Sequence, residues 1–111
     1  MIKMSDLKKV LKQEPLLTPN GIDWAGRFKE EWTNTELKQI QICCDYLDLC
    51  KTRKTINNNF SSYGLKHSVE AKYKEYVCNG AFIAALILKR IKYKKEHGCL
   101  NVYTVLSNKL P

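Results

Sequence analysis

The residue types best suited to metal binding or nucleophilic chemistry are five cysteines and two histidines. The number of cysteines is odd, and the first residues do not match the pattern of a signal peptide. Both observations favour reduced thiols over a disulfide framework. Structural zinc sites place paired ligands roughly two to four residues apart on a turn, whereas Cys43 and Cys44 are adjacent within a helical pattern. We therefore expect no disulfide, no metal and no other cofactor. The residues concerned are Cys43, Cys44, Cys50, Cys78, Cys99, His67 and His97.

The same residues do not form the pattern of a catalytic site. A reactive thiolate needs a neighbouring cation or a helix N-terminus, and only Cys78, just before an expected helix start, approaches that condition. His67 and His97 have no nearby serine and aspartate pattern that would complete a triad. The five glycines are dispersed and match neither a P-loop nor a dinucleotide-binding loop. The sequence therefore predicts a protein that is not an enzyme.

Positive charge is concentrated in the second half of the chain. Residues 51–111 carry twelve Lys or Arg against three Glu, and residues 1–50 carry seven Lys or Arg against eight Asp or Glu, for a net charge of +8. The densest run has five basic residues among the seven from Lys89 to Lys95, with no acidic residue inside it. Such one-sided charge attracts a polyanion through its long-range field and through counterion release. The alternative is a solvated face whose lysines keep the protein soluble.

Two basic segments and two tyrosines form the candidate nucleic-acid-binding set. Lysines outnumber arginines, which favours attraction to phosphates over bidentate recognition of guanine, so we expect low sequence specificity. The tyrosines would stack against an unpaired base. The sequence therefore predicts noncatalytic binding of DNA or RNA, mainly through phosphates. The candidate residues are Lys51, Arg53, Lys54, Lys89, Arg90, Lys92, Tyr93, Lys94, Lys95 and Tyr103.

The first half of the chain predicts two helices joined by an irregular segment. Apolar residues at helical spacing behind Ser5 predict a helix over 6–13 with Ser5 as its N-cap. The aromatic side chains of residues 22–32 are expected to fill the core. Thr33–Glu36 matches a capping box, and an apolar stripe continues to about Thr52, so this is the longest expected helix. Its stripe is expected to face the core, with dimerisation left open.

The middle of the chain predicts an exposed loop followed by a helix. Three basic residues run into three asparagines over 51–60, and asparagine side chains favour local hydrogen bonds to the backbone over a helix. Ser61 or Ser62 can then cap a helix that carries Tyr63 and Tyr73 on one face.

The last third of the chain predicts a central helix and then two strands. Asn79 can cap a helix over 80–90 that is apolar on every side, and such a helix must lie in the middle of the fold. The composition of 91–94 and 101–106 predicts two short strands that form a hairpin. We therefore expect a single domain over residues 1–111, mainly α with a small C-terminal β-hairpin, in the α+β class.

The order helix, turn, helix, hairpin also matches a winged helix-turn-helix. A recognition helix contacts bases through polar side chains, and residues 80–88 offer none, so we do not expect this helix to read bases. No apolar run is long enough to span a membrane, and we expect a cytoplasmic protein without membrane contact.

A resemblance is carried by three segments, Ser62–His67, Tyr76–Ala85 and Asn101–Tyr103. In these segments the chain resembles a loose group of small bacterial proteins carried by phages, plasmids and other mobile elements. Cys78 stands where that group more often has a small hydroxyl residue. The resemblance implies a genetic setting and assigns no activity and no site.

A second function class fits the same sequence. In this hypothesis the chain is an accessory or inhibitor protein of a mobile element that binds a protein partner, such as a host defence or nucleic-acid-handling complex. The lysines would dock on an acidic patch, and Trp24 and Trp32 would act as anchor residues. Binding to unrelated DNA or RNA that weakens steeply with salt distinguishes the first hypothesis from the second.

Overall fold

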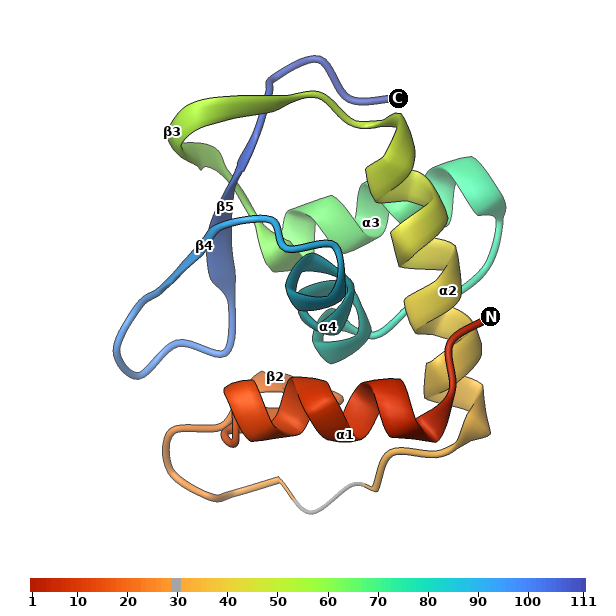
Figure 1. Cartoon of the computed structure of the whole chain (residues 1–111). Helices are drawn as coiled ribbons and strands as arrows, with labels where there is room; N and C mark the ends of the chain where they lie inside the picture. The colour runs from red at the N-terminus through yellow and green to blue at the C-terminus, as the bar shows by residue number, and fades with distance from the viewer. Residues whose placement is uncertain (29–30) are drawn as a thin grey trace.

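The computed structural model describes residues 1–28 and 31–111, so two positions of the predicted aromatic segment over 22–32 lie outside the described residues. The described part has an α+β fold of four helices and two small antiparallel sheets (Figure 1). The elements are α1 (Met4–Gln13), β1 (Leu17–Thr18), β2 (Gly21–Ile22), α2 (Asn34–Leu49), β3 (Thr52–Ser61), α3 (Ser62–Tyr73), α4 (Asn79–Leu88), β4 (Tyr93–Lys95) and β5 (Val102–Leu106).

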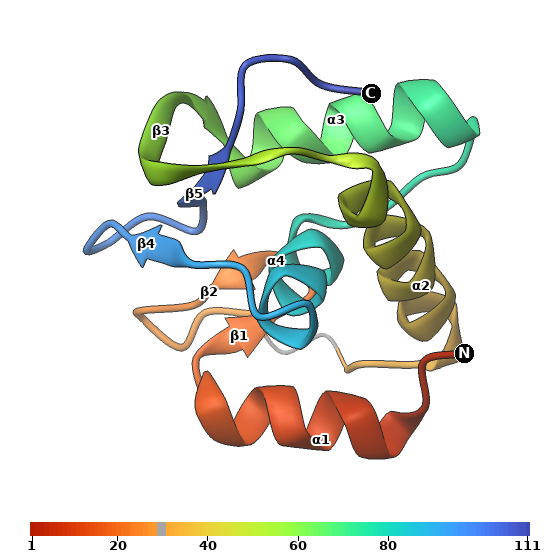
Figure 2. The same ribbon diagram turned by 45° about the horizontal axis from the view of Figure 1, so that its top comes forward.

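Helix α4 lies at the centre of the fold. Every residue from Asn79 to Ile87 is buried, because this segment is apolar all round and packs against α1, α2, α3 and the β1–β2 pair (Figures 1 and 2). The expectation of a central helix is confirmed. A helix buried on every side has no free face to enter a groove of DNA, so α4 is not positioned to read bases.

The helix starts show which capping predictions were right. Thr33 caps α2 in a capping box with Glu36. The Glu36 carboxylate accepts a hydrogen bond of 2.6 Å from the Thr33 backbone N–H. Ser61 caps α3 by accepting from the backbone N–H of Gly64 at 3.2 Å. Both of these predictions are confirmed.

Two other caps were assigned to the wrong residue. Helix α1 begins earlier than predicted, with Lys3 rather than Ser5 as its N-cap, and the Lys3 backbone N–H donates to the Asp6 carboxylate at 2.8 Å. Cys78 rather than Asn79 caps α4, because the Cys78 sulfur accepts from the backbone N–H of Ala81. The Asn79 side chain is used elsewhere in the fold.

Residues 51–60 form a strand for most of their length, so the predicted loop is wrong. Strand β5 is the central strand of a three-stranded sheet, with β3 and β4 antiparallel on its two sides. The β3–β5 register shifts on both sides of Asn57, whose buried side-chain amide donates to the Leu106 carbonyl at 3.0 Å. The Asn57 oxygen also accepts from the Asn59 backbone N–H. The local hydrogen bonds expected of asparagine are present, but they accommodate irregularities in a strand.

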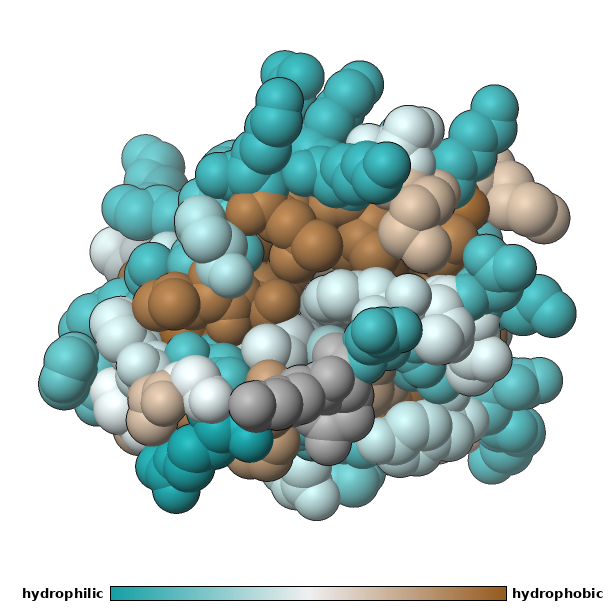
Figure 3. All heavy atoms as spheres, turned by 90° about the horizontal axis from the view of Figure 1, so that it is seen from below, coloured by the Kyte–Doolittle hydropathy of each residue, from teal (hydrophilic) through white to brown (hydrophobic). Residues whose placement is uncertain are grey.

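The face of the molecule that lies at the bottom of Figure 1 has both apolar and polar side chains on its surface. Figure 3 shows a band of apolar side chains on this face, bordered by hydrophilic ones. Among the helices of residues 1–28 and 31–111, none has the length and hydrophobicity needed to cross a bilayer.

Candidate nucleic-acid interface

One side of strand β4 is used to hold the fold together. Glu14 is only 3% exposed. Its carboxylate accepts a hydrogen bond from the Tyr93 phenol at 2.8 Å and forms an ion pair with the Lys95 ammonium at 3.1 Å. Burial raises the pKa of Tyr93 far above its usual value, and the hydrogen bond to Glu14 raises the pKa further. Tyr93 and Lys95 therefore anchor β4 to the end of α1, and the charge of Lys95 is balanced by Glu14.

The other side of β4 carries an exposed lysine beside a tyrosine. Lys94 lies directly opposite Tyr103 of β5 in the antiparallel register. Because successive side chains of a strand point to opposite faces, Lys94 faces away from the side that holds Glu14. Its ammonium is 3.7 Å from the Glu96 carboxylate, and both side chains are exposed, so this ion pair is weak. Lys94, which is exposed, and Tyr103, which is half-buried, thus lie side by side on the outer side of the sheet.

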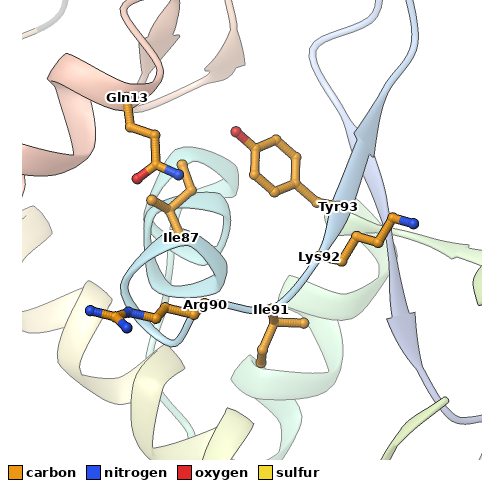
Figure 4. A pocket seen from close by; sticks show the side chains of 6 residues that line it. All are labelled: Gln13, Ile87, Arg90, Ile91, Lys92 and Tyr93. Carbon is orange, nitrogen blue, oxygen red and sulfur yellow. The ribbon is translucent and has the colours of Figure 1, made fainter. Parts of the chain in front are cut away.

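The end of α4 spreads its basic side chains rather than gathering them. Lys89 forms an ion pair with Asp48 of α2, and the hydrogen bond in this pair raises the pKa of Lys89. Arg90 and Lys92 form no ion pair with a carboxylate among the described residues. They flank a pocket of about 510 Å³ and extend in opposite directions in Figure 4. Both residues thus border the same pocket, but the Arg90 guanidinium points away from the Lys92 ammonium.

The second basic segment lies at the far edge of the same sheet. Lys51, Arg53 and Lys54 are all exposed, and Arg53 donates a hydrogen bond to the Thr55 hydroxyl at 3.2 Å. Strand β5 separates β3 from β4, so the two edge strands are about 10 Å apart across the sheet, given the usual spacing of strands.

The ten residues singled out in the sequence thus fall into two groups. Four are engaged elsewhere or point away from the rest: Lys89, Arg90, Tyr93 and Lys95. The other six belong to the three-stranded sheet or lie directly before one of its strands, and they are named here the basic sheet surface: Lys51, Arg53, Lys54, Lys92, Lys94 and Tyr103. The neutralising carboxylates of Glu14 and Asp48 come from distant parts of the chain, which local charge patterning does not detect.

A pocket that the candidate set did not contain lies between α3, the connection to α4, and the start of β5. Its volume is about 390 Å³. We name it the tyrosine pocket, and its lining residues are Pro19, Asn20, Tyr63, Lys66, His67, Glu70, Tyr76, Asn79, Leu100 and Asn101. The three segments on which the resemblance rests all contribute to this lining. Their tyrosine, lysine, histidine and asparagine side chains come together only in the folded chain.

The centre of the tyrosine pocket is a buried ammonium group. The side chain of Lys66 is 5% exposed, and its Nζ lies 3.0 Å from the Glu70 carboxylate. The same Nζ lies over two aromatic rings, 5.2 Å from the centre of Tyr63 and 4.5 Å from the centre of Tyr76. An ammonium has three N–H donors, and Glu70 is its one hydrogen-bond acceptor among the described residues. Lys66 therefore has donor capacity left for a ligand.

The charge of Lys66 is balanced within the pocket. Glu70 accepts from Lys66, from His67 Nδ1 at 2.8 Å and from the Val77 backbone N–H at 3.2 Å. Burial raises the pKa of Glu70, but these hydrogen bonds outweigh it, and the pKa lies below its ordinary value. Because the carboxylate is ionised, His67 must carry its proton on Nδ1. The Lys66–Glu70 pair is therefore neutral in total, and the pocket has no excess charge unless His67 is protonated.

Asn79 connects the walls of the tyrosine pocket. Its amide nitrogen donates to the Asn20 carbonyl at 3.1 Å and to the Asn101 side-chain oxygen at 3.0 Å. Its own side-chain oxygen is buried and has no hydrogen-bond donor among the described residues. An unpaired buried acceptor is costly in a folded protein, so this oxygen marks an incomplete polar network.

The cysteines and tryptophans have other roles in the fold. Burial raises the pKa of Cys78 to about 11, so its position at the start of α4 does not make it a reactive thiolate. Within residues 1–28 and 31–111, no group of three or more potential ligands is placed to hold a metal ion. The indole of Trp24 donates to the Cys99 carbonyl and packs on His97, while Trp32 is half-buried against the core. Both tryptophans are therefore engaged within the fold.

We compared the chain with models of protein families, with curated proteins and with solved structures, and none of the three comparisons found a match.

Proposed function

We propose that this protein binds nucleic acid without catalysis, through phosphate contacts made by the basic sheet surface. The observation that carries the proposal is the pair of Lys94 and Tyr103, which lie opposite each other on the sheet side that faces away from Glu14. A cation beside an aromatic ring suits a nucleotide, because the ammonium attracts the phosphate while the ring stacks on a base. Lys51, Arg53, Lys54 and Lys92 extend the positive field around this pair.

The proposed mode of binding follows from the composition of the surface. Lysine ammonium groups act as point charges that bind phosphates in many orientations, so the proposal includes low sequence specificity. The β4–β5 pair acts as the wing-like hairpin of the sequence expectation, while α4 stays inside the fold. The proposed binding takes place in the cytoplasm, with the protein either as a monomer or as an oligomer.

The test is a titration of the purified protein with single-stranded and duplex oligonucleotides across a salt series. Fluorescence anisotropy measures the binding constant at each salt concentration. The double variant K92E/K94E should weaken binding at least about tenfold and lower the slope of log K against log salt by about two. The matched control is K8E/K9E, which makes the same charge change on exposed residues of α1. The control should change affinity by less than about threefold, since its lysines lie outside the basic sheet surface.

Two results would overturn the proposal. One is the absence of binding to every oligonucleotide at low salt, and the other is an equal loss of affinity in the two double variants. In the first case, a stable complex with a purified protein partner would favour the accessory or inhibitor hypothesis.

A further inference from the structure

We propose that the tyrosine pocket holds one unpaired nucleobase of a bound single strand. The inference rests on the proposed function, because it assumes that a nucleic acid reaches this side of the molecule. It goes beyond that function by assigning a pocket that encloses one base, in addition to the phosphate contacts and the open stacking surface of Tyr103.

The aromatic walls of the pocket suit a flat ring. Tyr63 and Tyr76 are 51% and 64% exposed beside a pocket of about 390 Å³, so a ligand can reach their rings. His67 packs edge-on against Tyr63, with ring centres 4.6 Å apart, and holds that ring in place. Every nucleobase offers a π-face, and stacking on aromatic side chains is the usual way in which proteins bind unpaired bases.

The polar groups of the pocket need both an acceptor and a donor from the ligand. Lys66 has N–H groups without an acceptor, and Asn79 has a buried oxygen without a donor, among the described residues. A nucleobase presents carbonyl or ring-nitrogen acceptors and, in adenine, guanine and cytosine, an amino donor on one rigid edge. One base can therefore supply an acceptor to the N–H groups of Lys66, and its amino group can approach Asn79, which lines the same pocket.

The charge of the pocket argues against an anionic ligand. A phosphate or carboxylate placed against Lys66 would also approach Glu70, whose charge cancels that of the ammonium at 3.0 Å. A cationic ligand would meet Lys66 at the same place. A neutral ligand with polar edges and a flat ring avoids both repulsions.

The pocket and the basic sheet surface are close enough for one strand to reach both. Asn101 lines the pocket and stands two residues before Tyr103, a distance of about 7 Å in an extended chain. The Ser62 hydroxyl accepts from the Val102 backbone N–H at 3.0 Å and fixes the start of α3 beside β5. A base in the pocket would thus place neighbouring phosphates near Lys94. A base inside a duplex is stacked and paired and could not enter.

The first experiment isolates the base from the phosphates. Free nucleosides carry no phosphate, so we would titrate adenosine, guanosine, cytidine and thymidine into the labelled protein and follow chemical shifts by NMR. We expect the side-chain amide of Asn79 and the ring of Tyr76 to shift, and a shift at Tyr103 would report the separate stacking contact of the proposed function. Shifts absent from the pocket at millimolar nucleoside would overturn the inference.

The second experiment compares two substitutions at an exposed residue whose loss should not unfold the protein. Y76A should weaken single-strand binding by about tenfold, the usual effect of removing one stacking ring, and should leave duplex binding unchanged. Y76F keeps the ring and should bind single strands like the unmodified protein. If Y76A binds single strands as tightly as Y76F, the inference fails while the proposed phosphate binding stands. If no oligonucleotide binds at low salt, the proposed function itself is wrong, and the inference that rests on it is wrong as well.

Discussion

The phenol of Tyr93 donates a hydrogen bond of 2.8 Å to the carboxylate of Glu14, which lies just beyond the end of α1. This contact decides which basic residues of β4 are available. Lys95 turns to the same carboxylate, and Lys94, between the two, turns the other way. A run of basic residues that looks uniform in sequence is therefore divided into a structural side and an exposed side.

Removal of the Glu14 charge should destabilise the protein. Glu14 is buried and serves two partners, so E14Q leaves Lys95 without its carboxylate and should lower the free energy of unfolding by about 1–3 kcal/mol. The control is E96Q, which removes an exposed carboxylate and should change stability by less than about 0.5 kcal/mol. Urea denaturation measures both values. Equal stability of the two variants would show that Glu14 does not anchor β4.

Substitution of Gly80 by alanine should destabilise the protein, whereas the same substitution at Gly64 should not. A Cβ on Gly80 would overlap the Thr18 carbonyl oxygen and lie 2.8 Å from Pro19 Cα, so α4 must move away from the β1–β2 turn. G80A should therefore cost about 1–3 kcal/mol. G64A has open space, with its nearest neighbour at 3.9 Å, and should stabilise α3 by about 0.5–1 kcal/mol. Thermal unfolding of both variants gives the sign of each change.

The stability of the protein should fall in acid through Glu70. Its pKa in the folded state lies below the ordinary value of 4.5, so the folded state favours the ionised carboxylate. The resulting stabilisation is complete above the unfolded pKa and is lost as the pH falls through the lower, folded pKa. E70Q should be less stable at neutral pH and should lose less stability between pH 7 and pH 3. Unfolding curves with the same pH dependence in both proteins would contradict this role.

The five thiols should react in two classes. Cys99 is exposed, whereas Cys43, Cys44 and Cys78 are buried and Cys50 is half-buried, and burial raises the pKa of Cys44 and of Cys50 to about 11. A thiol reagent at pH 8 should therefore modify Cys99 rapidly, and the buried thiols only when the protein unfolds. The variant C99S should lose the rapid phase. A rapid reaction at Cys78 would show that the start of α4 opens in solution.

Local patterns were enough to predict several elements correctly. The Thr33–Glu36 capping box depends on residues three positions apart, so sequence alone identifies it, and the same kind of rule narrowed the cap of α3 to Ser61 or Ser62. The position of α4 followed from its composition, because a helix that is apolar on every side has nowhere else to go. Short-range rules failed where two local solutions were available, as at the start of α4, where Cys78 rather than Asn79 provides the cap.

By itself, the sequence determined the starts of α2 and α3, the central helix and the excess of positive charge, since these depend on neighbouring residues or on composition. Tertiary structure decided that residues 52–61 are a strand, because β5 supplies the hydrogen-bonding partner from more than forty residues away. It also decided which lysines are neutralised, through Glu14 and Asp48, and it brought Lys66, Tyr76 and Asn101 into one pocket. Ion pairs and pockets depend on distances in space, and sequence separation does not report those distances until the chain has folded.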